Sequence, residues 1–156
     1  MTGVGRPSHH VDRATRALAW VDGGSRGNPG EAGCGFVLVL PDGRREEHAV
    51  YLGHTTNNVA EYAALVAALE RAQTLGVKAL EVRADSELLV RQMTGAYRVR
   101  APHLQRLWLR ASQLARSFRA FAITHVPRHD NAAADRLANQ AMDTRTSTVP
   151  APKGLA

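Results

Sequence analysis

The 156-residue sequence has a single cysteine, few aromatic residues and no apolar run long enough to cross a membrane. One cysteine, Cys34, excludes an internal disulfide framework and fits the reducing cytoplasm, where we expect the protein to reside. Because Cys34 lies in the apolar stretch 33–40, we expect a buried, unreactive thiol. The polar N-terminus lacks the apolar segment of a secretory signal. The length fits one domain with an ordinary core.

Acidic residues are absent from residues 88–129, and this segment carries eight arginines. The formal net charge of the whole chain is +6, so the remainder is slightly acidic. A basic half beside an acidic half is the division that a nuclease requires, because arginines hold the phosphate backbone while acids hold metal ions. We expect Arg98 and Arg100 of this segment to contact phosphates.

Apolar patterning predicts an α/β fold. Strands are predicted at residues 18–21, 33–40, 44–52, 78–84 and 121–126, and helices at 57–75, 86–93, 102–118 and 132–142. Asn57 or Asn58 is expected to cap the first helix and Ser86 the second. This order predicts a mixed five-stranded sheet, three antiparallel strands plus two parallel ones, with helices on both faces. We expect a flexible leader at 1–16, one domain at 17–142 and a disordered tail at 143–156.

Four carboxylates stand in unusual local sequences. Asp22 ends an apolar strand and opens Asp-Gly-Gly-Ser-Arg-Gly-Asn-Pro-Gly, and Glu61 follows Thr-Thr-Asn-Asn-Val-Ala at the start of a helix. Asp85 ends a strand, and Asp135 lies in Asn-Ala-Ala-Ala-Asp near the last helix start. Acids at such positions can converge, and four converging acids cannot all stay ionised without cations. Mg²⁺ and Mn²⁺ are the oxygen-preferring candidates.

Each acid also has a purely structural interpretation. Asp22 would be a solvated acid beside a turn, although this does not explain an acid at the end of a buried strand. Glu61 would stabilise a helix N-terminus, Asp85 would cap the next helix, and Asp135 would be solvated on a terminal helix. The glycines after Asp22 let a ligand, such as RNA sugars, approach the backbone closely.

Taken in order, these four contexts resemble type 1 ribonuclease H, the metal-dependent nuclease that cuts the RNA strand of an RNA–DNA hybrid. The resemblance covers about Leu18 to Met142, and its specific motifs are Asp-Gly-x-x-x-x-Asn-Pro-Gly and Thr-Thr-Asn-Asn-x-x-Glu. It implies the ribonuclease H fold, with two Mg²⁺ or Mn²⁺ ions clamping the scissile phosphate. It also implies products with a 5′-phosphate and a 3′-hydroxyl. The implied metal ligands are Asp22, Glu61, Asp85 and Asp135.

The resemblance also implies contacts with the hybrid. Bases and phosphate would be touched by Asn28, Thr56, Asn57 and Asn58. The glycine-rich motif would contribute Gly23, Gly24 and Ser25.

The sequence departs from well-known bacterial members at three places. It lacks their separate basic protrusion, and Glu87 stands where a glutamine is expected. Their loop histidine is replaced by a shortened loop in which either Arg128 or His129 can assist catalysis. Histidine would titrate near neutral pH, whereas arginine stays charged. We favour Arg128, because it directly follows a strand end and compact relatives use an arginine here.

Two other functions fit parts of the pattern. A catalytically silent hybrid-binding module would share the fold, but it would lack one or more of the acids. A related nuclease of the same superfamily, such as a resolvase or exonuclease, would share the acids without the flanking motifs. The motifs are also compatible with cleavage of double-stranded RNA. We expect a monomer without membrane association.

Overall fold

The structure is a computed structural model that describes residues 15–155. The predicted leader therefore lies almost entirely outside the described residues. The strands are β1 (Arg16–Gly27), β2 (Gly30–Val39), β3 (Arg45–Thr55), β4 (Ala79–Ala84) and β5 (Ala120–His125). The helices are α1 (Asn57–Thr74), α2 (Glu87–Met93), α3 (Pro102–Ser117) and α4 (Ala132–Thr144), with the 3₁₀ helix η2 (Arg128–Asn131) directly before α4.

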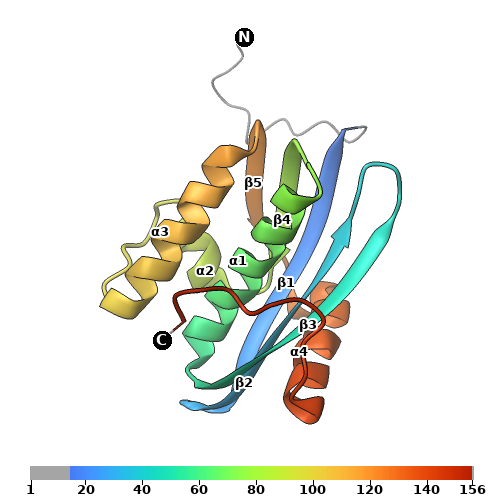
Figure 1. Cartoon of the computed structure of the whole chain (residues 1–156). Helices are drawn as coiled ribbons and strands as arrows, with labels where there is room; N and C mark the ends of the chain where they lie inside the picture. The colour runs from blue at the N-terminus through green and yellow to red at the C-terminus, as the bar shows by residue number, and fades with distance from the viewer. Residues whose placement is uncertain (1–14, 156) are drawn as a thin grey trace.

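The five strands form one mixed sheet in the order β3-β2-β1-β4-β5. β1, β2 and β3 are antiparallel neighbours, while β4 pairs in parallel with both β1 and β5. Helices α1 and α3 lie on one face of the sheet and α4 on the other (Figure 1). The predicted fold class is confirmed. None of the helices in the described residues is long and apolar enough to span a membrane.

Successive side chains of each strand point to opposite faces of the sheet, so a hydrophobic core forms on each face. In β1, Ala19 and Val21 face the large core under α1, whereas Trp20 packs on the other face with the α4 residues Leu137 and Ala141. Cys34 is fully buried in the large core, as predicted. The sheet is thus covered on both faces around β1 and β2, the two strands that carry the glycine-rich motif.

The glycine-rich motif is strand rather than loop, in contrast to the prediction. β1 continues past Asp22 to Gly27 and pairs with β2 throughout. The reason is packing: a Cβ on Gly23 would lie 2.1 Å from the α1 carbonyl oxygen of Ala60, and one on Gly35 would lie 2.8 Å from the α4 carbonyl oxygen of Ala134. Glycines at these positions let both helices approach the sheet closely, which fixes the two acids that the helices carry.

The helix caps partly differ from the prediction. α1 is capped by Thr56, whose Oγ1 accepts a hydrogen bond of 3.2 Å from the Val59 N–H, rather than by Asn57 or Asn58. The Asn57 N–H instead donates to Asn28 Oδ1 at 3.1 Å and ties the β1–β2 turn to the start of α1. Ser86 caps α2, as predicted.

The segment after α4 was predicted to be disordered, but it lies along the edge of β3. Ser147 Oγ accepts from the Tyr51 N–H at 2.8 Å, and the Thr148 N–H donates to the Ala49 carbonyl at 2.8 Å. Val149 then packs against the large core. The order arises because this segment satisfies outward backbone groups of an edge strand, a long-range requirement that local sequence does not reveal.

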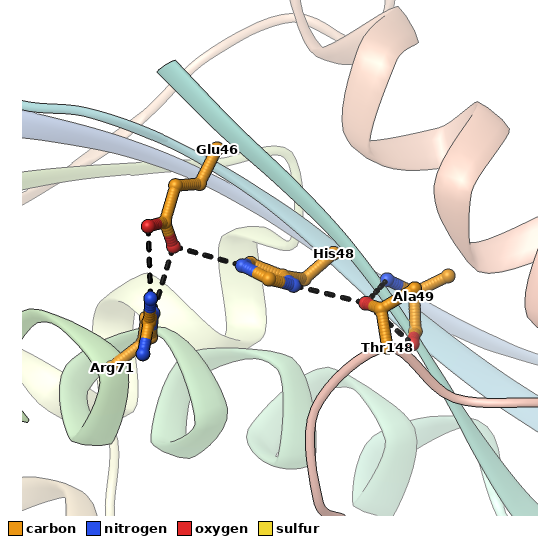
Figure 2. Close-up of polar contacts among 5 residues, drawn as sticks. All are labelled: Glu46, His48, Ala49, Arg71 and Thr148. Atoms are coloured by element: carbon orange, nitrogen blue, oxygen red, sulfur yellow. Dashed lines mark hydrogen bonds and ion pairs between the residues drawn. The ribbon is translucent and has the colours of Figure 1, made fainter. Parts of the chain in front are cut away.

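A polar network links α1, β3 and the C-terminal segment (Figure 2). Arg71 donates to both Glu46 carboxylate oxygens at 2.7 and 2.9 Å, and the Glu46 carboxylate lies 2.8 Å from His48 Nε2. His48 Nδ1 lies 2.9 Å from Thr148 Oγ1, which accepts from the Ala49 N–H at 3.0 Å. Hydrogen bonding by Arg71 lowers the pKa of Glu46 from its usual 4.5 to about 2.

We predict that Glu46→Gln lowers the free energy of unfolding at pH 7 by about 1 kcal/mol. A carboxylate whose pKa is depressed by folding contributes stability above its unfolded pKa of about 4.5 and loses it as the pH falls toward 2. The difference between wild type and variant should therefore shrink below pH 4.5 in urea unfolding experiments. Glu47→Gln, on the opposite sheet face, is the matched control and should show a smaller effect. A pH-independent difference would rule out this ionic contribution.

Candidate active site

Asp22 occupies the centre of the candidate site. It pairs with Gly35 across the β1–β2 ladder, and its side chain is 9% exposed. Asp22 lies just beyond the end of the pairing between β1 and β4, because these strands pair only as far as Val21 and Ala84. Asp85 follows β4 directly. Parallel pairing therefore places these two acids side by side at one end of the sheet.

Glu61 reaches this point from α1. Its Oε1 accepts a hydrogen bond of 2.8 Å from the Gly23 N–H, and Ser86 donates to its carboxylate as well. The close approach of α1 at Gly23 thus fixes Glu61 directly beside Asp22. One carboxylate oxygen from each of Asp22, Glu61 and Asp85 lies within 4.8 Å of the other two.

Asp135 approaches from the opposite face of the sheet. It lies in the first turn of α4, where Gly33 and Gly35 admit that helix close to β2. Its carboxyl is near enough to that of Asp22 to contribute to the raised pKa of Asp22. Asp135 lines the same cavity of about 300 Å³ as the other three acids.

Besides the four acids, the cavity has nine lining residues. They are Gly23, Gly24, Ser25, Arg26, Asn57, Arg128, Ala138, Asn139 and Met142. The structure therefore gathers residues from β1, α1, α4 and η2, together with Asp85 at the end of β4.

Electrostatics in this cavity disfavours full ionisation. Burial, followed by repulsion from Glu61 and Asp85 and contact with Asp135, raises the pKa of Asp22 far above its usual 3.8. Burial also raises the pKa of Glu61 to about 7, although hydrogen bonds from Gly23 and Ser86 and the charge of Arg128 oppose the rise. Neighbouring acids with raised pKa values are typical of sites that function with a bound cation or a proton.

The donor set fits a hard divalent cation. All the ligand atoms offered are carboxylate oxygens, the type that Mg²⁺ and Mn²⁺ prefer, and three lie close enough together to share one ion. A cation here would replace the protons that burial and repulsion otherwise favour on Asp22 and Glu61. The residues that would hold it are Asp22, Glu61 and Asp85, with Asp135 at the side.

The two candidate helper residues are separated by the structure. Arg128 lines the acid cavity, and its charge acts on the Glu61 carboxylate. The His129 side chain is 81% exposed and lies 3.5 Å from Asp130. Among the described residues, His129 is not one of those lining the acid cavity.

The predicted substrate contacts are distributed over two regions. Asn57 lines the cavity and its N–H donates to Asn28 Oδ1, while Asn58, next in sequence, is exposed. Thr56 has its hydroxyl in the helix cap. Ser25 lines the cavity, and its buried Oγ has no hydrogen-bond partner among residues 15–155.

Arg98 and Arg100 lie in the connection between α2 and α3, outside the acid cavity. Arg98 lines a separate hollow of about 630 Å³ together with Tyr97 and Trp108. Both arginines are exposed, so their guanidinium groups are available to phosphates.

Four cavity residues were not predicted from the sequence: Arg26, Ala138, Asn139 and Met142. Arg26 stands inside the glycine-rich motif, four residues after Asp22. Asn139 follows Asp135 by four residues, so the two share a helix face. Spacing from the predicted acids would therefore have indicated both.

Comparison with known proteins identifies the family of the chain. The family model described as "Reverse transcriptase-like" matches residues 20–141. Ribonuclease HI of Halobacterium salinarum is 49% identical over 133 residues, which cover 85% of this chain and 67% of that protein. The bifunctional protein Rv2228c of Mycobacterium tuberculosis is 46% identical over 132 residues, but the match covers only 36% of its length.

Solved structures give the same result. The crystal structure of Halobacterium salinarum ribonuclease H1 superimposes with a TM-score of 0.79 at 48% identity, covering 83% of this chain and 98% of that one. A compost-derived ribonuclease H1 (LC11), in complex with an RNA/DNA hybrid, gives a TM-score of 0.77 at 43% identity, covering 83% and 98%. The matched family model defines the chain as reverse transcriptase-like. More particularly, the chain belongs to the type 1 ribonuclease H family.

We predict that Asp22→Asn stabilises the metal-free protein. Because folding raises the pKa of Asp22, the folded state keeps a proton that the unfolded state releases above about pH 4. Wild-type stability in chelator should therefore fall as the pH rises from about 4, whereas the variant lacks this loss. At pH 8 we expect the variant to be more stable by about 1–3 kcal/mol.

The measurement is urea unfolding in chelator, repeated with excess Mg²⁺. Mg²⁺ should stabilise the wild type more than the variant and reduce the difference between them. Asp42→Asn, in the exposed turn between β2 and β3, is the control and should not stabilise. If Asp22→Asn is no more stable than wild type at pH 8 without metal, the acids do not destabilise the fold as argued.

Proposed function

We propose that this protein is an endonuclease that hydrolyses the RNA strand of RNA–DNA hybrids. The observation that carries the proposal is the convergence of four acids and Arg128 on one cavity. Membership of the ribonuclease H family and 43% identity to a ribonuclease H1 that is solved with an RNA/DNA hybrid support the choice of substrate. The products would carry a 5′-phosphate and a 3′-hydroxyl. A monomer in the cytoplasm is part of this proposal, and the single buried cysteine fits a reducing compartment.

The carboxylates of the four acids would together be the ligands of two Mg²⁺ or Mn²⁺ ions. Asp22 lies between Glu61 and Asp85 on one side and Asp135 on the other, so its carboxylate is placed to be shared. Two such ions would supply a more acidic bound water and charge neutralisation at the leaving oxygen. Glu61 is held by the Gly23 N–H and Asp22 by the sheet, so the ligands need little rearrangement.

The other polar residues of the cavity orient the hybrid. Asn57 lines the cavity with Asn28 bonded to its N–H, and the Ser25 Oγ, which has no hydrogen-bond partner among residues 15–155, would bond an RNA sugar. Arg128 places a permanent positive charge next to the phosphate position. The exposed Arg98 and Arg100 extend the contact along the backbone of the hybrid.

The direct test offers end-labelled hybrid, duplex RNA, duplex DNA and single strands, each with Mg²⁺, Mn²⁺ or chelator. We expect internal cuts in the RNA of the hybrid with either metal and none in chelator. Asp85→Asn should lower kcat at least about 100-fold, because this ligand stabilises charge in the transition state. A variant that cuts at the wild-type rate would contradict the assignment. Cleavage of duplex RNA at a comparable rate would extend the substrate range.

We further predict that Arg128, rather than His129, assists turnover. Arg128→Ala should lower kcat by about 10- to 100-fold, since it removes a charge inside the cavity. His129→Ala should remain within about twofold, and Arg128→Lys should keep part of the activity. The measurement is kcat for each variant between pH 6 and 9. A larger loss for His129→Ala, with loss of an acidic limb in the profile, would assign the role to histidine.

A further inference from the structure

Two residues outside the acids connect β1 to α4 at the edge of the cavity. Arg26 Nη2 donates to Asn139 Oδ1 at 3.2 Å and also lies 2.7 Å from the Asp143 carboxylate. Asn139 Nδ2 in turn donates to the backbone carbonyl of Asp135 at 3.0 Å. A continuous polar path therefore runs from the strand that carries Asp22 to the backbone of the acid that approaches from α4.

This path lies where the site most needs support. Asp22 and Asp135 belong to different elements, and their side chains come together in one cavity from β1 and from α4. Their separation therefore depends on how α4 is held against β1. Arg26 and Asn139 each lie four residues beyond the acid of their own element and join the two elements at that cavity.

We infer that Arg26 and Asn139 are positioning residues that hold Asp135 at the metal site. The inference rests on the function proposed above and names two residues that act through the Asp135 backbone. Replacing an outer hydrogen-bond partner of a metal ligand weakens metal binding or activity by about tenfold or more. Asn139 carries no charge, so its effect on cation binding must come from geometry.

Substitution of Arg26 distinguishes an effect of its charge on cation binding from an effect on the position of α4. If its guanidinium acted only as a nearby charge, Arg26→Ala would strengthen cation binding to the acids. If it holds α4 in place, the same substitution weakens cation binding. A third role, direct contact with a phosphate, would raise KM for the hybrid and change the salt dependence of binding by about one unit of slope.

The test measures Mn²⁺ binding by isothermal titration calorimetry, and kcat and KM on an end-labelled hybrid. Asn139→Ala and Arg26→Ala should each weaken Mn²⁺ binding and lower kcat by about tenfold, with KM for the hybrid nearly unchanged. The double variant should lose no more than the stronger single variant, because both residues act through one connection. Arg136→Ala is the control: it removes another link between α4 and the sheet, to Glu47 at 3.4 Å, and should leave Mn²⁺ binding unchanged.

Unchanged or tighter Mn²⁺ binding in both single variants would overturn the inference. A raised KM with unchanged Mn²⁺ binding in Arg26→Ala would also overturn it and identify a phosphate contact instead. If the wild type does not cut the hybrid, the proposed function fails, while the Mn²⁺ titrations still decide the positioning role. Unfolding free energies of all variants show whether each remains folded.

Discussion

The carboxylates of Asp22, Glu61 and Asp85 repel one another, and the fold has to hold them together against this repulsion. Their nearest oxygens lie within 4.8 Å of one another, and at that limit two unit charges would repel by about 3 kcal/mol at an effective dielectric constant of 20. The opposing force comes from backbone packing rather than from ion pairs. Gly23 admits α1 and Gly35 admits α4, so helices on both sheet faces are docked without intervening side chains.

This constraint explains why the site is built from rigid elements. Asp22 lies within a paired strand, Glu61 in the second turn of a long helix, and Asp135 in a helix that packs against three strands. Loops could not resist mutual repulsion as well, because their backbone is less restrained. The loss of solvent around Asp22 is the consequence of the same packing, and it makes a bound cation the natural means of neutralisation.

Local sequence was sufficient for the element order and the four acids, since apolar periodicity and short motifs are local signals. It did not reveal the features that depend on contacts between residues distant in the sequence. Glycines are poor strand formers, so the pattern gave no sign that β1 continues to Gly27. Three adjacent capping residues, Thr56, Asn57 and Asn58, are equivalent locally, and the bond from Asn57 to Asn28 decides between them.

Arg26 and Asn139 are 113 positions apart, so their contact is visible only in three dimensions. Similarly, the different positions of Arg128, which lines the cavity, and His129, which is exposed, follow from η2, because successive side chains of a 3₁₀ helix point about 120° apart.

The C-terminal segment on β3 has a consequence for handling the protein. An open sheet has two exposed edges, and an uncovered edge of this kind invites pairing with another molecule. Here Ser147 and Thr148 form hydrogen bonds with backbone groups of β3 that would otherwise be available to another strand. A variant truncated after α4 would keep every residue that lines the cavity, but it would expose the edge of β3 to pairing with other molecules. The covering of this edge strand therefore depends on residues outside the active-site cavity.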